Sequence, residues 1–134
     1  MGTENKRSAS ITFRGFLVRP EEVERLVGVK AALLAQSGQP MRPNRPNVWL
    51  RSAARFEVEF PDQTLIVDMV PAILTHAGGV ERLCAVRDLV QPQFLEINLV
   101  LPIKQSESQD DGYLDAETLQ KIGRLGATLG LSFL

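Results

Sequence analysis

Each end of this chain couples one apolar, strand-like run to one amphipathic helix, and this coupling limits the folds open to it. Near the start, the run Ile11–Leu17 leads into a helical pattern from Pro20 to Gly28. Near the end, a helical pattern from Asp115 to Gly130 leads into a last apolar run, 131–134. A strand with one apolar face and a helix with one apolar stripe must bury these surfaces against other elements. We therefore predict that both ends belong to one sheet.

Length and charge narrow the function classes. The 134 residues match one domain, 1–134, in which we expect residues 1–8 to be a flexible leader. The 15 basic and 16 acidic residues are interspersed, so no broad basic field is offered to nucleic acid or to anionic lipid. A single cysteine, Cys84, excludes an internal disulfide framework. Because the sequence has neither a membrane-length apolar stretch nor a signal-peptide core, we expect a soluble cytoplasmic protein.

The middle of the chain contains an irregular segment followed by strand patterns. Residues 30–47 begin with a possible helical turn and continue with prolines at three-residue spacing, which forbid a helix. We expect an exposed loop there. Residues 48–52 and 56–60 both have strand character, as one long bent strand or as a hairpin that turns between them. No Gly or Asn lies at the junction, which slightly favours the bent strand.

Helical spacing appears twice more before the clearest strand. We expect Asp62 to cap a helix whose apolar residues run from Leu65 to Leu74, with a kink at Pro71. A second helix is predicted over 79–90. The strand over 94–103 has apolar residues at every odd position.

The order of these elements predicts a two-layer α+β fold. We expect an antiparallel or mixed sheet of four or five strands, with the helices mainly on one face. The predicted core is Ile11, Phe13, Leu26, Val58, Leu74, Leu83, Leu99, Ile122, Leu129 and Phe133. The predicted uncovered face carries Thr12, Arg14, Phe16, Glu57, Glu59, Phe94, Glu96, Asn98 and Val100.

Four segments carry a family resemblance. Residues 10–28 contain an opening strand, a Pro-Glu-Glu helix start and a Leu-x-Gly helix end, and 48–52 contain a tryptophan strand. Residues 94–101 form a further strand, and 114–134 close with a leucine, an acid, a helix and a strand. Together these segments resemble the bacterial family catalogued as DUF4279, a domain of unknown function. The resemblance implies an α+β fold and a bacterial cytoplasmic setting, and it implies no activity.

Residues with catalytic chemistry are sparse. His76 is the only histidine, and it has no second His or Cys at ligand spacing, so we expect no metal. Cys84 lies on an apolar helical stripe, which is typical of a small buried residue. Glu57 and Glu59 share one strand face, more simply as solvated charges than as a catalytic pair. We expect no cofactor and no catalytic residue, and an enzymatic function is disfavoured.

One constellation invites a binding hypothesis. Trp49 lies among Arg42, Arg45 and Arg51, and Trp beside Arg is typical of interface hot spots. Arginine also clamps carboxylates and phosphates. The simpler alternative is that Trp49 packs in the core while the arginines are solvated.

Two function classes follow. The first is a protein-interaction module, either an adaptor or an immunity-type protein that neutralises a toxin. The second is a small-molecule-binding protein or degenerate enzyme with an arginine-lined pocket.

The uncovered sheet face is the expected interaction surface. Its mixture of charges with Phe94 and Val100 is too apolar for ordinary solvent exposure and too polar for a core. We expect this face to bind a second copy of the chain or another protein, with Arg14 opposite an acidic residue to fix the register. Coverage of the face by the chain's own Arg42–Asn47 loop would contradict this hypothesis.

Overall fold

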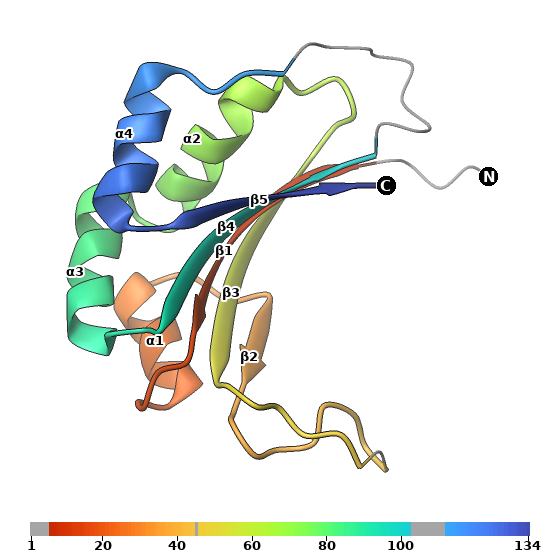
Figure 1. Cartoon of the computed structure of the whole chain (residues 1–134), viewed down its shortest axis with the longest axis vertical. Helices are drawn as coiled ribbons and strands as arrows, with labels where there is room; N and C mark the ends of the chain where they lie inside the picture. Colours follow the sequence, from red (N-terminus) through yellow and green to blue (C-terminus); the bar gives the residue numbers. More distant parts are fainter. Residues whose placement is uncertain (1–5, 45, 103–111) are drawn as a thin grey trace.

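A mixed β-sheet forms the centre of the protein. The computed structural model describes residues 6–44, 46–102 and 112–134, and within them it has four helices and one five-stranded sheet (Figure 1). In chain order the elements are β1 (Arg7–Arg14), α1 (Pro20–Val27), β2 (Leu33–Ala35), β3 (Ala53–Phe60), α2 (Ile66–His76), α3 (Val80–Val90), β4 (Phe94–Leu101), α4 (Ala116–Leu125) and β5 (Thr128–Phe133). The predicted α+β class is confirmed.

The strand order is β2-β3-β1-β4-β5. The central strand β1 pairs antiparallel with both β3 and β4, and β3 pairs antiparallel with β2. The last strand, β5, lies parallel to β4 and forms one edge of the sheet. Both strand–helix couplings seen at the ends of the sequence therefore contribute to one sheet, as predicted.

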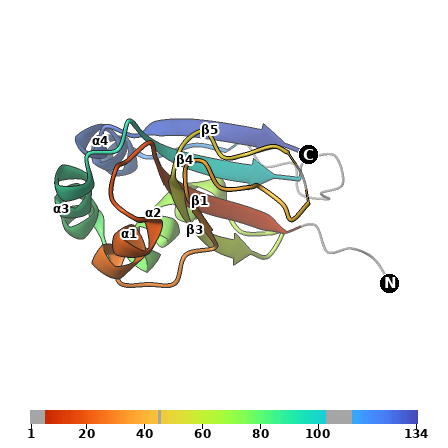
Figure 2. The same ribbon diagram turned by 90° about the horizontal axis from the view of Figure 1, so that it is seen from below.

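All four helices lie on the same side of the sheet (Figures 1 and 2). The core fills the space between the helices and the sheet. At its centre, the rings of Phe13 and Phe56 pack edge to face with their centroids 6.4 Å apart. Of the predicted core, Ile11, Phe13, Leu74, Leu83, Leu99 and Ile122 are buried. Leu26, Val58 and Leu129 are half-buried against that core. Phe133 is 55% exposed, so its prediction was wrong.

Phe133 is exposed because β5 is an edge strand. Alternation places Phe133 on the helix side of the sheet, but α4 ends at Leu125 and the helix layer does not extend over the end of β5 (Figure 1). The prediction for Phe16 was also wrong, because it was expected on the uncovered face. Phe16 is 5% exposed and packs in the core. It follows a turn at Gly15, so the strand alternation no longer governs its direction.

Gly15 joins three strands at one point. Its N–H donates to the Ser52 carbonyl at 2.9 Å, and its carbonyl accepts from the Gln93 N–H at 3.1 Å. Its φ is +73°, and an added Cβ would lie 2.4 Å from Gln93 Oε1. Glycine is therefore required here both for the backbone conformation and for space.

Several predicted boundaries needed correction. Strand β1 begins at Arg7, so residues 7 and 8 are not part of a flexible leader, while 1–5 lie outside the described residues. Helix α2 has Leu65 rather than Asp62 at its N-cap, and Pro71 lies inside it without ending it. Helix α4 begins after Asp115 as predicted but ends with Gly126 at φ +67°, not at Gly130. Gly130 belongs to β5, where an added Cβ would meet Asn98 Oδ1 at 2.8 Å.

The segment before β3 differs most from its prediction. Residues 33–35 form β2 instead of a helical turn, because Ala32 and β2 bond to the β3 backbone. Residues 48–52 form neither a bent strand nor half of a hairpin within the sheet. They return along a projecting loop, residues 36–52, which we call the arm, and β3 begins only at Ala53 (Figure 1).

Candidate functional site

The sheet face opposite the helices is the open face. Strand register assigns to it the residues Ser8, Ser10, Thr12 and Arg14 of β1, Ala53, Arg55, Glu57 and Glu59 of β3, Phe94, Glu96, Asn98 and Val100 of β4, and Thr128, Gly130 and Ser132 of β5. Apart from Phe16, every residue predicted for this face lies on it. No helix or strand of the described residues covers it, and the arm projects away from it (Figure 1).

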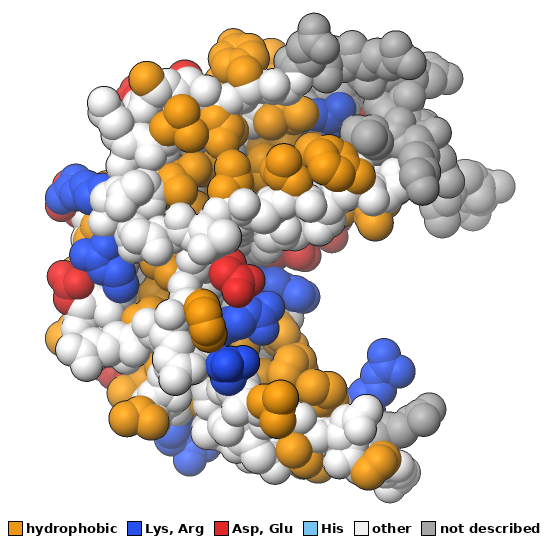
Figure 3. Space-filling view, in the orientation of Figure 1, with side chains coloured by type: hydrophobic (Ala, Val, Ile, Leu, Met, Phe, Trp, Pro, Cys, Tyr) orange, Lys and Arg blue, Asp and Glu red, His pale blue; other side chains and the backbone are white. Residues whose placement is uncertain are grey.

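A hollow lies between the arm and the open face. The space-filling view shows it as a wide notch bordered by hydrophobic and basic side chains (Figure 3). The sheet contributes a floor of small residues, since Ser10, Thr12 and Ala53 are all at most 7% exposed. The neighbouring side chains on this face are longer and surround these small residues. This explains why the hydroxyl groups of Ser10 and Thr12 are buried although no helix or strand covers the face.

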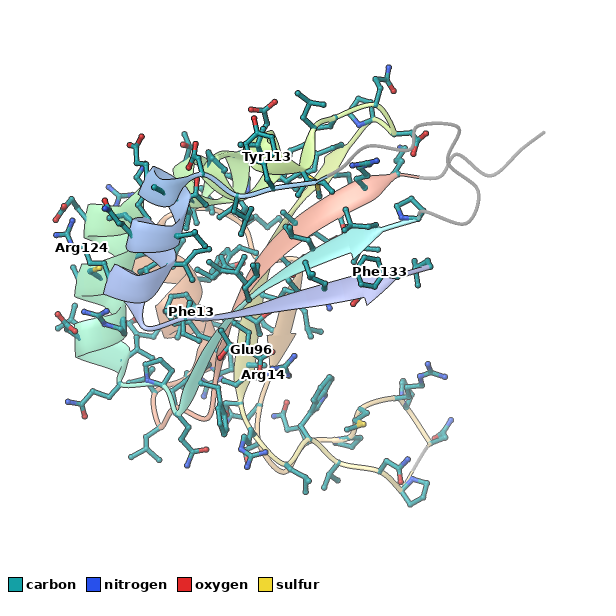
Figure 4. The ribbon with its side chains drawn as sticks, turned by 45° about the horizontal axis from the view of Figure 1, so that its top comes forward. Phe13, Arg14, Glu96, Tyr113, Arg124 and Phe133 are labelled. Carbon is teal, nitrogen blue, oxygen red and sulfur yellow. The ribbon has the colours of Figure 1, made fainter. Side chains whose placement is uncertain are left out.

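Arg14 and Glu96 form an ion pair on this face within the chain, whereas the sequence analysis expected Arg14 to face an acidic residue across an interface, which stays a prediction. Arg14 Nε lies 3.5 Å from Glu96 Oε2, and the two side chains are 36% and 42% exposed (Figure 4). The pair bridges β1 and β4 within one chain. At this exposure the attraction is screened by solvent, so its main effect is to hold both side chains in place.

Arg51 and Phe94 extend this pair into a cluster. The Arg51 guanidinium lies 5.1 Å from the centroid of the Phe94 ring, a cation–π contact. Arg51 Nε also donates to Gln93 Oε1 at 3.1 Å. Because Phe94 is the strand partner of Arg14, these contacts unite Arg14, Arg51, Phe94 and Glu96, which we call the arginine–phenylalanine cluster.

The arm presents the remaining candidate residues. It is held by paired backbone bonds, Gly38 N–H to the Trp49 carbonyl at 2.8 Å and Trp49 N–H to the Gln39 carbonyl at 2.9 Å. At its base the buried Ser52 Oγ accepts from the Ser37 N–H at 3.0 Å. Trp49 is half-buried, whereas Arg42 is exposed near the tip, and Arg45 lies outside the described residues. The structure therefore separates Arg42 from the cluster that contains Arg51.

The arm also exposes apolar side chains that the sequence analysis missed. Met41, Val48 and Leu50 are 46%, 41% and 82% exposed. For Val48 and Leu50 the signal was the apolar Val-Trp-Leu run, which the sequence analysis interpreted only as part of a sheet strand.

Two arginines were also missed. Arg55 lies half-buried on the open face with its Nε buried, and Arg7 is 2% exposed on the helix side. Neither Arg55 Nε nor Arg7 Nε and Nη1 has a hydrogen-bond partner among the described residues. Only the sheet register, which sequence alone does not supply, places these side chains.

The histidine and the cysteine weighed for catalytic or metal chemistry lie on different helices. His76 is exposed at the end of α2, and Cys84 is half-buried on α3. Within the described ranges, no three His, Cys, Asp or Glu side chains are grouped as a metal site would require. The longest helices there, α2 and α3, have 11 residues each, and none of the described helices could cross a bilayer.

Shifted pKa values occur in the helix layer, away from the open face. Arg124 of α4 (Figure 4) donates two hydrogen bonds to the Glu81 carboxylate of α3, one of them with an N–O distance of 2.8 Å. These hydrogen bonds lower the pKa of Glu81. Asp115 accepts from the Thr118 N–H at 2.8 Å, and hydrogen bonds to Thr118 lower its pKa. These groups join and cap helices, so the charge interactions that shift them are structural.

An apolar groove borders the helix side of β5. It has a volume of about 420 Å³ and is lined by Ile66, Leu99, Leu101, Gly112, Tyr113, Leu114, Leu129, Leu131 and Phe133. Figure 4 places Tyr113 before α4 and Phe133 at the end of β5. A second, shallower depression lies along α1 and includes Glu24, Arg25 and Lys30. Neither contains the arginines of the predicted pocket.

Comparison of the chain with family models, with curated proteins and with solved structures found no match in any of the three.

Proposed function

We propose that this protein is a protein-interaction module that binds its partner in the hollow between the arm and the open face. The observation that carries the proposal is the combination of an uncovered sheet face with an arm whose Met41, Val48 and Leu50 are exposed. Exposed apolar side chains and contacts between arginine and aromatic rings are both typical of protein interfaces.

The charges of the hollow favour a polypeptide partner over a polyanion. Arg14 is already paired with Glu96, and Arg51 is engaged by Phe94 and Gln93. Nucleic-acid sites instead offer clustered, unneutralised cations to phosphates. A partner with an exposed apolar anchor and a balanced charge rim fits this surface best.

An adaptor or an immunity-type role, in a bacterial cytoplasm, is the biological setting we propose. Membership of the DUF4279 family belongs to the same proposal and rests on the four segments quoted above. The α+β fold agrees with what that family resemblance implies.

The alternative is a small anionic ligand bound at the sheet. Its support is Arg55, whose buried Nε has no hydrogen-bond partner among the described residues. A carboxylate or phosphate bonded there would satisfy that N–H.

Affinity capture from the native host tests the main proposal when it is run with matched variants. The double variant Phe94→Asp/Leu50→Asp is expected to lose the captured protein, since Phe94 lies on the open face, Leu50 belongs to the arm, and both side chains are exposed. Leu17→Asp is the control, because Leu17 is fully exposed between β1 and α1. Capture that survives the double variant, or that is lost equally in the control, contradicts the proposal.

A thermal-shift screen tests the alternative. A ligand present at about 100 times its Kd adds about 2.7 kcal/mol of stability. If such a ligand exists, Arg55→Gln is expected to abolish its stabilising effect while the double variant above retains it.

A further inference from the structure

The edge strand β5 lacks the features that normally prevent an edge strand from pairing with a strand of another molecule. Its sequence, Thr-Leu-Gly-Leu-Ser-Phe, contains no charge and no proline. Within the described residues, β5 pairs only with β4, so its other edge presents unpaired backbone groups. Natural proteins usually protect such an edge with Lys, Pro, a bulge or a covering element, because it otherwise pairs with another chain.

The backbone of β5 defines which groups are available. The Leu134 N–H donates to the Leu101 carbonyl of β4 at 3.1 Å, so the backbone groups of this even-numbered residue point inward. Successive residues of a strand point their N–H and C=O to opposite edges. The N–H and C=O of Leu129, Leu131 and Phe133 therefore point to the outer edge.

The same three residues carry the apolar side chains of β5. Leu131 and Phe133 are 51% and 55% exposed, and all three line the groove on the helix side. Their neighbours Thr128, Gly130 and Ser132 are small and lie on the open face. The strand thus has one apolar row and one small row, with no charge on either.

This pattern is complementary to itself. In an antiparallel pair centred on Leu131, Leu131 faces its own copy and each Leu129 faces the other chain's Phe133. All three pairs are then of the hydrogen-bonded type, and apolar side chains meet only apolar side chains. No like charges oppose one another across the pair.

The opposite edge of the sheet argues against a head-to-tail arrangement. That edge is β2, which has only three residues and leads directly into the arm. Six residues of β5 find no strand of matching length there, whereas a second β5 matches fully. The favoured contact is therefore two-fold and closed.

We propose that two copies of this protein associate through antiparallel pairing of their β5 strands about an axis at Leu131, forming one continuous ten-stranded sheet. Phe133 of each copy then covers the groove beside Leu129 of the other. The contact is separate from the open face, so a partner and the second copy bind at the same time.

Phe133 and Phe94 provide a matched test by sedimentation over the micromolar range. Both are phenylalanines on strands, with similar exposure of 55% and 47%, but Phe94 lies on the open face. Wild type and Phe94→Asp are expected to show the mass of a dimer, and Phe133→Asp is expected to weaken dimerisation by about tenfold or more. A monomeric wild type, or a dimer lost with Phe94→Asp but kept with Phe133→Asp, overturns the proposal.

Leu131→Pro tests the backbone pairing without depending on a new charge. The Leu131 N–H points away from β4, so proline removes no bond within the chain yet blocks the centre of the proposed pair. We expect it to give a folded monomer with a near-normal circular dichroism spectrum. A variant that is folded and still dimeric contradicts the proposed pairing.

Amide exchange of the wild type gives a readout that needs no variant. The N–H groups of Leu131 and Phe133 are expected to gain protection as concentration rises, whereas those of Gly130 and Ser132 are protected at all concentrations. Equal exchange of Leu131 and Phe133 at low and high concentration would overturn the proposal. None of these measurements involves the partner of the open face, so failure here leaves the proposed function standing, and the reverse is also true.

Discussion

The two faces of the sheet are built from different kinds of residue, although they share every strand. On the helix-covered face, β4 presents Leu95, Ile97, Leu99 and Leu101, all at most 6% exposed. On the open face, the same strand presents Phe94, Glu96, Asn98 and Val100, all half-buried or exposed. The comparison teaches that alternation along one strand separates buried apolar side chains from more exposed, chemically mixed ones, residue by residue.

The open face is not simply a solvated surface. Its small floor residues Ser10 and Thr12 are buried, while the arginine–phenylalanine cluster above them is partly exposed. The open face therefore combines buried small residues with partly exposed charged and aromatic ones, a mixture that β4 does not present on its helix-covered side.

Replacing Leu99 and Val100, which are adjacent on β4, tests the comparison most strongly. Leu99→Ala is expected to lower the free energy of unfolding by about 2–5 kcal/mol, because it opens a cavity beneath the helices. Val100→Ala, on the open face, is expected to lower it by less than about 1 kcal/mol. Denaturant unfolding measures both. Similar losses would show that the two faces are not energetically distinct.

Gly15→Ala tests whether the open-face cluster depends on the junction of β1, β3 and β4. The substitution is expected to lower stability by about 1–3 kcal/mol, because φ is +73° and the new Cβ would collide with Gln93, which holds Arg51. Gly123→Ala is the control, since an added Cβ in that exposed helical position meets no heavy atom within 4 Å. It is expected to stabilise α4 by up to about 1 kcal/mol. A neutral Gly15→Ala would indicate that the junction relaxes freely.

The Arg14–Glu96 pair allows a sharper measurement on the open face itself. A double-mutant cycle with Arg14→Ala and Glu96→Ala is expected to give a coupling of about 0.2–1 kcal/mol, because both side chains are more than a third exposed. The coupling should shrink at high salt. A larger, salt-insensitive value would mean that the ion pair is desolvated, which would contradict the proposal that this face is an uncovered interaction surface.

The pH dependence of stability tests the Glu81–Arg124 contact, which belongs to the helix layer and not to the open face. The folded-state pKa of Glu81 is lowered by its hydrogen bonds to Arg124. Its contribution to stability is therefore present above the unfolded-state pKa and is lost as the pH falls through the folded-state pKa. Glu81→Gln is expected to lower the melting temperature slightly at neutral pH and not at all once wild-type Glu81 is protonated. Arg124→Gln should reproduce this profile, and a pH-independent difference would contradict the charge interaction as its cause.

Local rules in the sequence were sufficient for α1, α3 and the faces of β4. Pro20 and Gly28 fix the limits of α1 through backbone properties that they carry in any context. The odd and even residues of β4 differ so strongly in polarity that only one orientation buries the apolar set. Asp115 likewise caps α4 with its own side chain.

Contacts between distant segments decided the rest. Two glycines were available to end α4, and the close approach of β5 to Asn98 assigns Gly130 to the strand and leaves Gly126 as the cap. The arm exists because residues 36 and 37 bond to Ser52, which no local pattern encodes.

The candidate site shows the same division. Alternation alone predicted Arg14, Phe94 and Glu96 on one face, and the structure confirms that placement. Arg51 lies beside them because the backbone of Gly15 bonds to Ser52 before β3 and to Gln93 before β4. Arg42 lies apart from them because it belongs to the far end of the arm. Residue type and spacing determine which face a side chain occupies, whereas strand pairing and loop closure determine its neighbours, because those contacts join residues far apart in the chain.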